Sequence, residues 1–215
     1  DPETFEINNF TIPTVVAPAD SNVIKVNANH VKRVEITNDL DKLHLHIKSP
    51  SLPVGEQNSY FYIGSFAQDK PNREQPDKNA KDKHTSSLHM KMFLASLAVA
   101  AFKIGKEEVI VPISTGLPIK ELKQVDTSKI LEMYKGTHIL EAMDGVYQGK
   151  KVTLKIEDGQ IGAEGITSIL ALQFDIKEKT FVETEESERF EKSYIIADLG
   201  AGTLDEAIYE DGALN

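Results

Sequence analysis

Alternation of apolar and polar residues marks several short segments of the chain as strands. Residues 31–36, 43–47 and 152–156 alternate in this way. Residues 60–66 are a further short strand, and residues 137–142 form a segment that ends before a turn at Asp144-Gly145. Successive side chains of a strand point to opposite faces of its sheet, so alternation predicts strands with one face on a core. The chain is therefore expected to contain a sheet built from widely separated segments.

Three helices are predicted, the first of them from capping residues and apolar spacing. Thr85 or Ser86 can accept hydrogen bonds from free first-turn amides, and Gly105 can end the helix that follows in a left-handed conformation. Apolar residues lie almost all round this helix, which predicts a central position. A second helix is predicted over 128–134, ended by Gly136, and a short helix over 166–174.

The remaining segments are interpreted from apolar runs, turn residues and polar stretches. The continuous apolar run within 107–113 predicts an inner strand covered on both faces, followed by a loop at 114–118. Residues 5–12 predict a hairpin that turns at two asparagines. Residues 68–83 are polar throughout and predict a mobile surface loop, and residues 177–192, which lack an apolar cluster, predict a solvated connection.

The last predicted element carries the clearest chemistry. A buried strand over 194–198 ends at Asp198, and a glycine-rich stretch leads into a second strand over 204–209. Gly200 and Gly202 let several amide N–H groups point into one concavity, where they can bind an oxyanion. Asp198 is placed to hold Mg²⁺ directly or through water, and Thr203 adds a hydroxyl donor. A tight hairpin without a ligand remains the alternative.

Composition narrows the classes of function. The chain has 215 residues and a formal charge of −10, so its overall field repels nucleic acid and anionic lipid. It has no cysteine, which excludes disulfides, thiolate metal sites and cysteine nucleophiles and fits a reducing cytoplasm. No apolar run approaches the roughly 20 residues that a transmembrane helix needs. A cytoplasmic globular protein is expected.

Other known motifs are absent or weak. The sequence contains no Gly-x-x-x-x-Gly-Lys-Ser/Thr phosphate loop and no Gly-x-Ser-x-Gly nucleophile elbow, and Asp205 stands where a dinucleotide fingerprint needs glycine. His44 and His46 share a strand face at a spacing that suits a transition metal. No third ligand is near in sequence, and Lys42 and Lys48 lie in phase, which is typical of a polar sheet face.

Residues 197–205, Ala-Asp-Leu-Gly-Ala-Gly-Thr-Leu-Asp, resemble the second phosphate loop of bacterial actin-like ATPases, especially plasmid-segregation proteins of the ParM type. Three other stretches resemble this family in the same order: Phe-Thr-Ile-Pro-Thr at 10–14, Tyr-Ile-Gly at 62–64 and Ser-Thr-Gly-Leu-Pro at 114–118. The resemblance implies an α/β, ribonuclease-H-like lobe of the actin, Hsp70 and sugar-kinase superfamily, with a mixed sheet flanked by helices and a small inserted subdomain.

The resemblance also implies roles for individual residues. Asp198 would hold Mg²⁺ through water, and the phosphates of ATP or GTP would be bound by Gly200, Ala201, Gly202 and Thr203. Glu164 lies where the family has a residue that orients the attacking water, a step in phosphoryl transfer that depends on positioning. A surface glutamate at a helix start, favoured by the helix dipole, is the alternative for Glu164.

Two departures from the family pattern affect the expected organisation. The chain has no second Asp-x-Gly to serve as the family's first phosphate hairpin, and it stops soon after residue 205. We therefore expect residues 1–215 to form a first lobe without its first phosphate hairpin and without the second lobe, with a possible inserted subdomain at 20–84. Such a fragment is expected to bind nucleotide weakly and to lack full ATPase activity.

The leading functional prediction is a bacterial, cytoskeletal, actin-like protein that forms nucleotide-dependent filaments for plasmid partition. It would associate with itself and reach DNA through an adaptor protein, without binding nucleic acid or membrane directly. Two alternatives stay open: a non-catalytic module that caps or regulates actin-like filaments, and a small-molecule kinase of the same superfamily.

Overall fold

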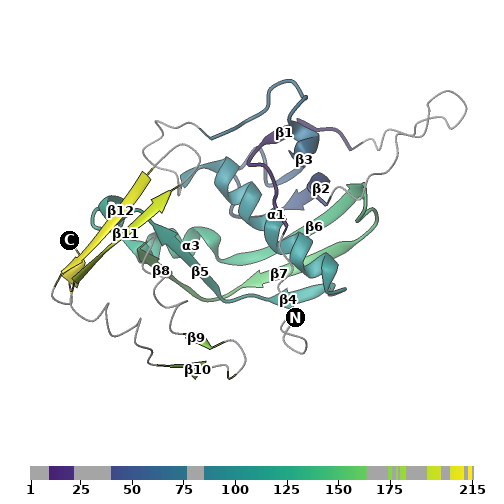
Figure 1. The fold of residues 1–215 in the computed structure, drawn as a ribbon. Coiled ribbons are helices and arrows are strands. Elements are labelled where there is room, and N and C mark those ends of the chain that lie inside the picture. The colour runs from purple at the N-terminus through teal and green to yellow at the C-terminus, as the bar shows by residue number, and fades with distance from the viewer. Residues whose placement is uncertain are drawn as a thin grey trace, which may run out of the picture. The chain divides into compact units, whose positions relative to one another are not determined.

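The computed structural model describes residues 10–21, 40–76, 85–163, 174–175, 178, 180–182, 193–199, 204–210 and 213–214. The chain divides into two compact units. The larger, which we call the sheet unit, comprises residues 10–113 and 130–159, and the smaller, the hairpin unit, comprises 1–9, 114–129 and 160–215. Figure 1 labels the elements of both.

Six strands of the sheet unit form one mixed sheet (Figure 1). Across the sheet their order is β1 (Val16–Ala19), β3 (Asn58–Gly64), β2 (Lys42–Lys48), β6 (Gly136–Asp144), β7 (Lys151–Ile156) and β4 (Glu108–Ile110). Neighbouring strands are antiparallel except β4 and β7, which are parallel. The predicted strands at 43–47, 60–66, 137–142 and 152–156 are confirmed within one or two residues.

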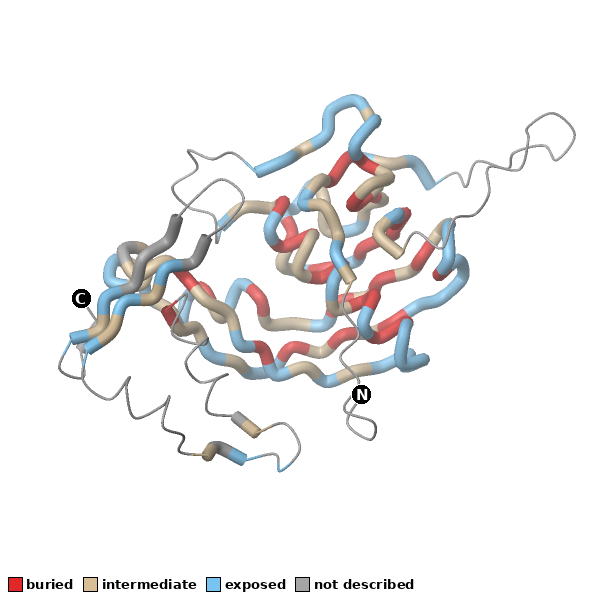
Figure 2. Tube along the Cα trace, in the orientation of Figure 1, coloured by how far each residue is buried: buried red, intermediate tan, exposed pale blue. Residues whose placement is uncertain are grey.

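The alternating pattern places one face of this sheet on a core. Leu43, Leu45 and Ile47 of β2 are buried, and the same alternation buries Val152 and Leu154 of β7. A register shift between His44 and Leu45 is the one irregularity in the pairing of β2 with β6. Figure 2 shows the buried residues concentrated on these strands and on the long helix α1.

Helix α1 (Ser87–Lys103) contacts β1, β6 and β7 and confirms the predicted long helix. Gly105 follows it with φ 69°, a left-handed conformation that suits the end of a helix. Ser86 takes the N-cap position with an extended backbone, but its side chain makes no capping hydrogen bond. The helix is held in place by buried side chains such as Leu94, Ala98 and Phe102 rather than by its cap.

The predicted inner strand at 107–113 is wrong. Within the described residues, β4 is only three residues long, lies at the edge of the sheet and leaves Ile110 61% exposed. Pro112 has no N–H to donate to a ladder, so pairing is interrupted there. The chain continues as β5 (Ile113–Leu117), which pairs with β8 (Gly159–Ala163); residues 114–117 are therefore a strand and not the predicted loop.

Two short helices follow β5. These are α2 (Ile119–Leu122) and α3 (Thr127–Tyr134), and α3 confirms the helix predicted over 128–134. Asp126 precedes α3 and accepts hydrogen bonds from the amide of Ser128, at 3.1 Å, and from its hydroxyl, at 2.5 Å. These bonds, chiefly the one from the hydroxyl, lower the pKa of Asp126. An N-terminal cap that the sequence analysis did not assign thus starts this helix.

The remaining strands belong to the hairpin unit. They are β9 (Phe174–Asp175) paired with β10 (Thr180–Phe181), and β11 (Ser193–Leu199), β12 (Leu204–Glu210) and β13 (Ala213–Leu214) in a second antiparallel sheet. The strands predicted at 194–198 and 204–209 are confirmed. No helix among the described residues is long and apolar enough to cross a membrane.

Several predictions fall outside the described residues. These are the first part of the hairpin at 5–12, the strand at 31–36, the helix at 166–174 except its last residue, most of the connection at 177–192, and residues 77–83 of the polar loop. In the described part of that loop, Glu74 pairs with Val16. The inserted subdomain at 20–84 stays a prediction.

Candidate phosphate-binding hairpin

Strands β11 and β12 form the stem of the element that the sequence singles out. β11 is rich in aromatic and β-branched residues, which favour a pleated, half-buried strand. It pairs with β12 residue for residue, from Ser193 opposite Glu210 to Leu199 opposite Leu204. The expected order of strand, glycine-rich connection and strand is therefore present with an antiparallel register that has no bulge.

Residues 200–203 connect the last pair of this stem, Leu199 and Leu204. The proposed phosphate ligands Gly200, Ala201, Gly202 and Thr203 lie outside the described residues, so their role stays a prediction. The register nevertheless limits the connection to the length of a short hairpin loop.

Asp198 lies one position before the end of β11, opposite Asp205 of β12. The backbone of both residues is described, but their side chains are not. Acids directly opposite one another in an antiparallel pair are unfavourable unless something neutralises them. Carboxylate oxygens suit Mg²⁺, so the residue types at this position fit a magnesium ion. Only the strand register shows that Asp205 lies opposite Asp198.

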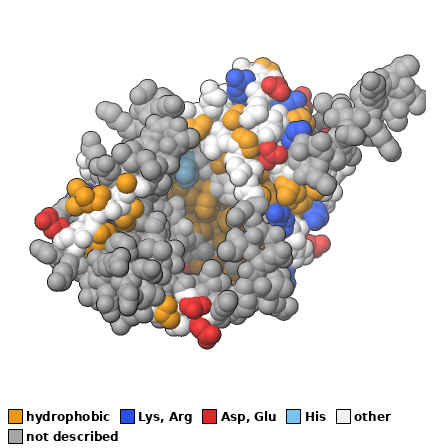
Figure 3. All heavy atoms as spheres, viewed as in Figure 1, with side chains coloured by type: hydrophobic (Ala, Val, Ile, Leu, Met, Phe, Trp, Pro, Cys, Tyr) orange, Lys and Arg blue, Asp and Glu red, His pale blue; other side chains and the backbone are white. Residues whose placement is uncertain are grey.

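Two cross-strand pairs further along the stem stabilise the hairpin. The rings of Tyr194 and Tyr209 stack with centroids 4.8 Å apart, and burial, followed by the charge of Tyr209, raises the pKa of Tyr194. Ile195 lies opposite Ile208 on the other face, and these side chains are 67% and 44% exposed. Figure 3 shows hydrophobic side chains gathered where this hairpin lies in Figure 1. The stem thus has stabilising contacts that do not involve the loop.

Glu164, the candidate for orienting water, follows β8 directly and lies outside the described residues. Its neighbour Ala163 ends β8 and is buried. The structure thus describes the strand that leads to Glu164 but not the glutamate itself. Its catalytic role stays a prediction.

The two histidines set aside as a weak metal pair have other partners. His44 is buried, donates from Nε2 to the carbonyl oxygen of Asp20 at 3.1 Å and packs against the ring of Tyr62. Burial lowers the pKa of His44. The expected polar sheet face thus includes a histidine that is buried and hydrogen-bonded. His46 donates to Asn58 Oδ1 at 2.8 Å and stacks on Tyr60. Within the described part of the chain, no three His, Asp or Glu side chains form a metal-binding group.

Residues 3–166 match the sequence model of a family described as "Actin like proteins N terminal domain". No curated protein matched the chain. The family match covers the sheet unit and ends before β11, so it is independent of the hairpin that carries the candidate site.

Solved structures are similar over nearly the whole chain. Bacillus thuringiensis ParM in apo form is 39% identical, with a TM-score of 0.78 over 96% of this chain and 52% of that chain. The same protein solved with ATP is 40% identical, with a TM-score of 0.76 over 96% of this chain and 51% of that chain. The actin-like protein Alp7A is 22% identical, with a TM-score of 0.64 over 94% of this chain and 51% of that chain, and supports the fold alone.

These similarities confirm the predicted α/β, actin-type lobe with a mixed sheet. The chain spans about half the length of the Bacillus thuringiensis ParM structures.

Proposed function

Because the chain belongs to the actin-like proteins, we propose that it is the nucleotide-binding first lobe of a ParM-type protein whose filaments separate plasmid copies. The observation that carries the proposal is the unbroken pairing of β11 with β12, which includes Asp198 and ends on either side of the Gly-Ala-Gly-Thr connection at 200–203. The similarity to Bacillus thuringiensis ParM, a protein solved with ATP and with ADP, supports a nucleotide as the ligand.

In this proposal the hairpin binds the terminal phosphates. Gly200, Ala201, Gly202 and Thr203 donate backbone and hydroxyl hydrogen bonds to phosphate oxygens. Asp198 holds Mg²⁺ through water, and the ion, when bound, neutralises charge on the phosphates. Glu164 orients the attacking water or accepts its proton.

The activity of the chain by itself follows from how such sites work. A nucleotide held between two facing lobes gains affinity and water exclusion when the lobes close on it. Residues 1–215 correspond to one lobe, so we expect weak nucleotide binding and negligible hydrolysis.

We further propose self-association into filaments in the cytoplasm and a link to DNA through an adaptor protein. The formal charge of −10 disfavours direct contact with DNA or with anionic lipid. Mixing the chain with Bacillus thuringiensis ParM and ATP, and following light scattering, separates assembly from capping. Co-assembly supports this proposal, whereas a dose-dependent block of ParM growth with no assembly supports a filament-capping module.

The phosphate site is tested by calorimetric titration of ATP and of GTP, each with and without Mg²⁺. Thr203→Val and Asp198→Asn should weaken binding, and Asp198→Asn should also remove most of the effect of Mg²⁺. Asp158→Asn is the matched control, because Asp158 is not part of the hairpin, its Oδ1 accepts from the amide of Gly159 at 2.7 Å, and asparagine keeps that acceptor. If neither Thr203→Val nor Asp198→Asn binds nucleotide more weakly than the control does, the proposed site is wrong. The base preference is given by whichever of ATP and GTP binds more tightly.

A further inference from the structure

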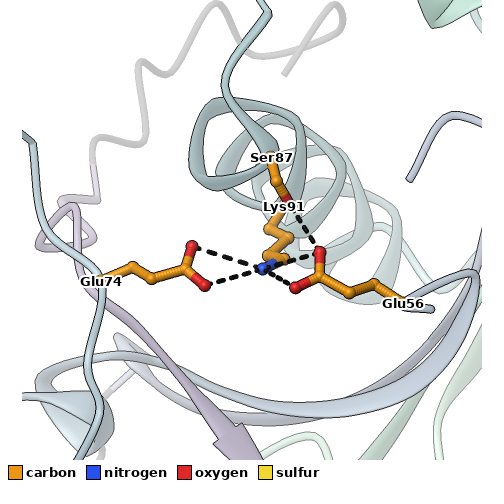
Figure 4. Close-up of polar contacts among 4 residues, drawn as sticks. All are labelled: Glu56, Glu74, Ser87 and Lys91. Carbon is orange, nitrogen blue, oxygen red and sulfur yellow. Dashed lines mark hydrogen bonds and ion pairs between the residues drawn. The ribbon is translucent and has the colours of Figure 1, made fainter. Parts of the chain in front are cut away.

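A buried lysine in the middle of α1 joins three segments of the sheet unit. Lys91 is 0% exposed, and its Nζ lies 3.0 Å from Oε1 and from Oε2 of Glu56 (Figure 4). It also lies 3.3 Å and 3.4 Å from the two carboxylate oxygens of Glu74, and 4.7 Å from the centre of the Phe61 ring. The ammonium is fully desolvated, so its charge must be balanced by these carboxylates.

The two carboxylates are not equivalent. Glu56 lies in the loop between β2 and β3, and its Oε2 also accepts from the Ser87 hydroxyl at 2.6 Å. Among the described residues, Lys91 is the one hydrogen-bond or ion-pair partner of the Glu74 side chain. Glu74 makes longer contacts with Lys91 than Glu56 does, and its side chain is 42% exposed, against 32% for Glu56. One ammonium faces two carboxylates, so either acid can leave without stranding the cation. The contact distances and exposure make Glu74 the one that leaves more readily.

Glu74 also covers the outer edge of the sheet. Its amide donates to the Val16 carbonyl at 2.6 Å, and the Val16 amide donates to the Glu74 carbonyl at 3.0 Å. These two bonds occupy the backbone amide and carbonyl of Val16, which point away from β3. An uncovered edge strand is a template for pairing with another chain, and Pro18, which has no N–H, protects the next part of the same edge.

We propose that Lys91 is a clasp that holds Glu74 on the edge of β1, with Glu56 as its fixed partner and Glu74 as its releasable one. When Glu74 leaves Lys91, the hydrogen bonds that cover the edge of β1 at Val16 open, while Glu56 keeps Lys91 neutralised and the rest of the sheet intact. The proposal concerns a conformational device of the sheet unit and does not depend on nucleotide binding.

Hydrogen exchange of the full chain, read residue by residue by NMR, tests the clasp at the Val16 amide. Glu74→Gln should speed exchange of this amide about tenfold, because a hydrogen-bonded contact to a charged group is lost. Glu56→Gln should leave exchange at Val16 unchanged or slow it, because Lys91 then has Glu74 as its sole anionic partner. A merely structural cluster would speed exchange in both variants alike.

Controls separate local opening from unfolding. The amides of Leu45 and Leu140, both fully buried in the centre of the sheet, should keep their rates in every variant. Glu132→Gln breaks the exposed pair with Lys135 in the same unit and should not change exchange at Val16. If Glu74→Gln also speeds the central amides, Glu74→Asp replaces it, because aspartate keeps the charge but is too short to reach Lys91.

The proposal is overturned if neither variant of Glu74 changes exchange at Val16 by more than about twofold, or if Glu56→Gln speeds it as much as Glu74→Gln does.

Discussion

Replacing Ser49 by alanine should destabilise the sheet unit, because it leaves a buried histidine nitrogen without a partner. His138 is 0% exposed, and its Nε2 lies 3.0 Å from the Tyr134 carbonyl oxygen. A carbonyl can only accept, so Nε2 carries the proton and Nδ1 is the acceptor of a neutral ring. Ser49 Oγ lies 2.8 Å from that Nδ1 and donates to it.

The expected loss in free energy of unfolding follows from the polar groups that the substitution leaves without a hydrogen-bond partner. A buried acceptor left without a donor lowers the free energy of unfolding by about 1–3 kcal/mol. The Ser49 hydroxyl also accepts from the amide of Ser51 at 3.1 Å, and this partly buried amide loses its partner too. We therefore expect Ser49→Ala to lower the free energy of unfolding by about 2 kcal/mol.

Urea denaturation at pH 7.5, followed by far-ultraviolet circular dichroism, measures this difference. Ser96→Ala is the matched control, because the Ser96 hydroxyl only bonds the Met92 carbonyl on the exposed side of α1. The control should change the free energy of unfolding by less than about 0.5 kcal/mol. If Ser49→Ala changes it no more than Ser96→Ala does, the assignment of the Ser49–His138 bond as a stabilising contact is wrong.

Two further predictions concern pH and backbone conformation. Burial lowers the pKa of His44 and of His138 below the unfolded value of about 6.5, so the unfolded chain binds more protons than the folded chain as pH falls. The stabilising contribution of these histidines should be complete above about pH 6.5 and decline below it, by at most about 1.4 kcal/mol per pH unit for each histidine. Urea titrations between pH 7.5 and 5.5 measure this decline. A flat profile would contradict the burial of these rings as neutral groups. Gly64 has φ 71°, and a Cβ there would meet the Asp41 carbonyl oxygen, so Gly64→Ala should lower the free energy of unfolding by at least about 2 kcal/mol. Gly55→Ala is the control and should not lower it, because the space around Gly55 is open. Equal effects of the two substitutions would contradict the argument that an alanine at position 64 is strained.

Local patterns were sufficient for the regular elements of the sheet unit. The alternation of 43–47 and 152–156 predicts β2 and β7, and the glycines at 105 and 136 predict where helices end. The apolar run at 107–113 predicts one inner strand, which is wrong, because the hydrophobic pattern alone does not register that a proline interrupts the hydrogen bonds of a strand. Pro112 divides it, which leaves β4 at an edge and starts β5.

Contacts between distant segments were beyond the sequence argument. Lys91 lies in an apolar helix and its two partners are 35 and 17 residues away, so no spacing rule joins them. The phosphate-binding part of the candidate site is recognisable because its residues are contiguous between 198 and 203, whereas Glu164 is assigned only from the family resemblance. The pairing of Asp198 with Asp205 across the hairpin needed the register.

Binding of nucleotide phosphates by residues 200–203 can be observed by titrating Mg²⁺ and ATP into the ¹⁵N-labelled chain and following each amide by NMR. The amides of Gly200 and Gly202 should shift progressively with nucleotide concentration, while those of α1 and β7 should not. Unchanged Gly200 and Gly202 amides at the highest soluble nucleotide concentration, or shifts confined to other segments, would contradict it.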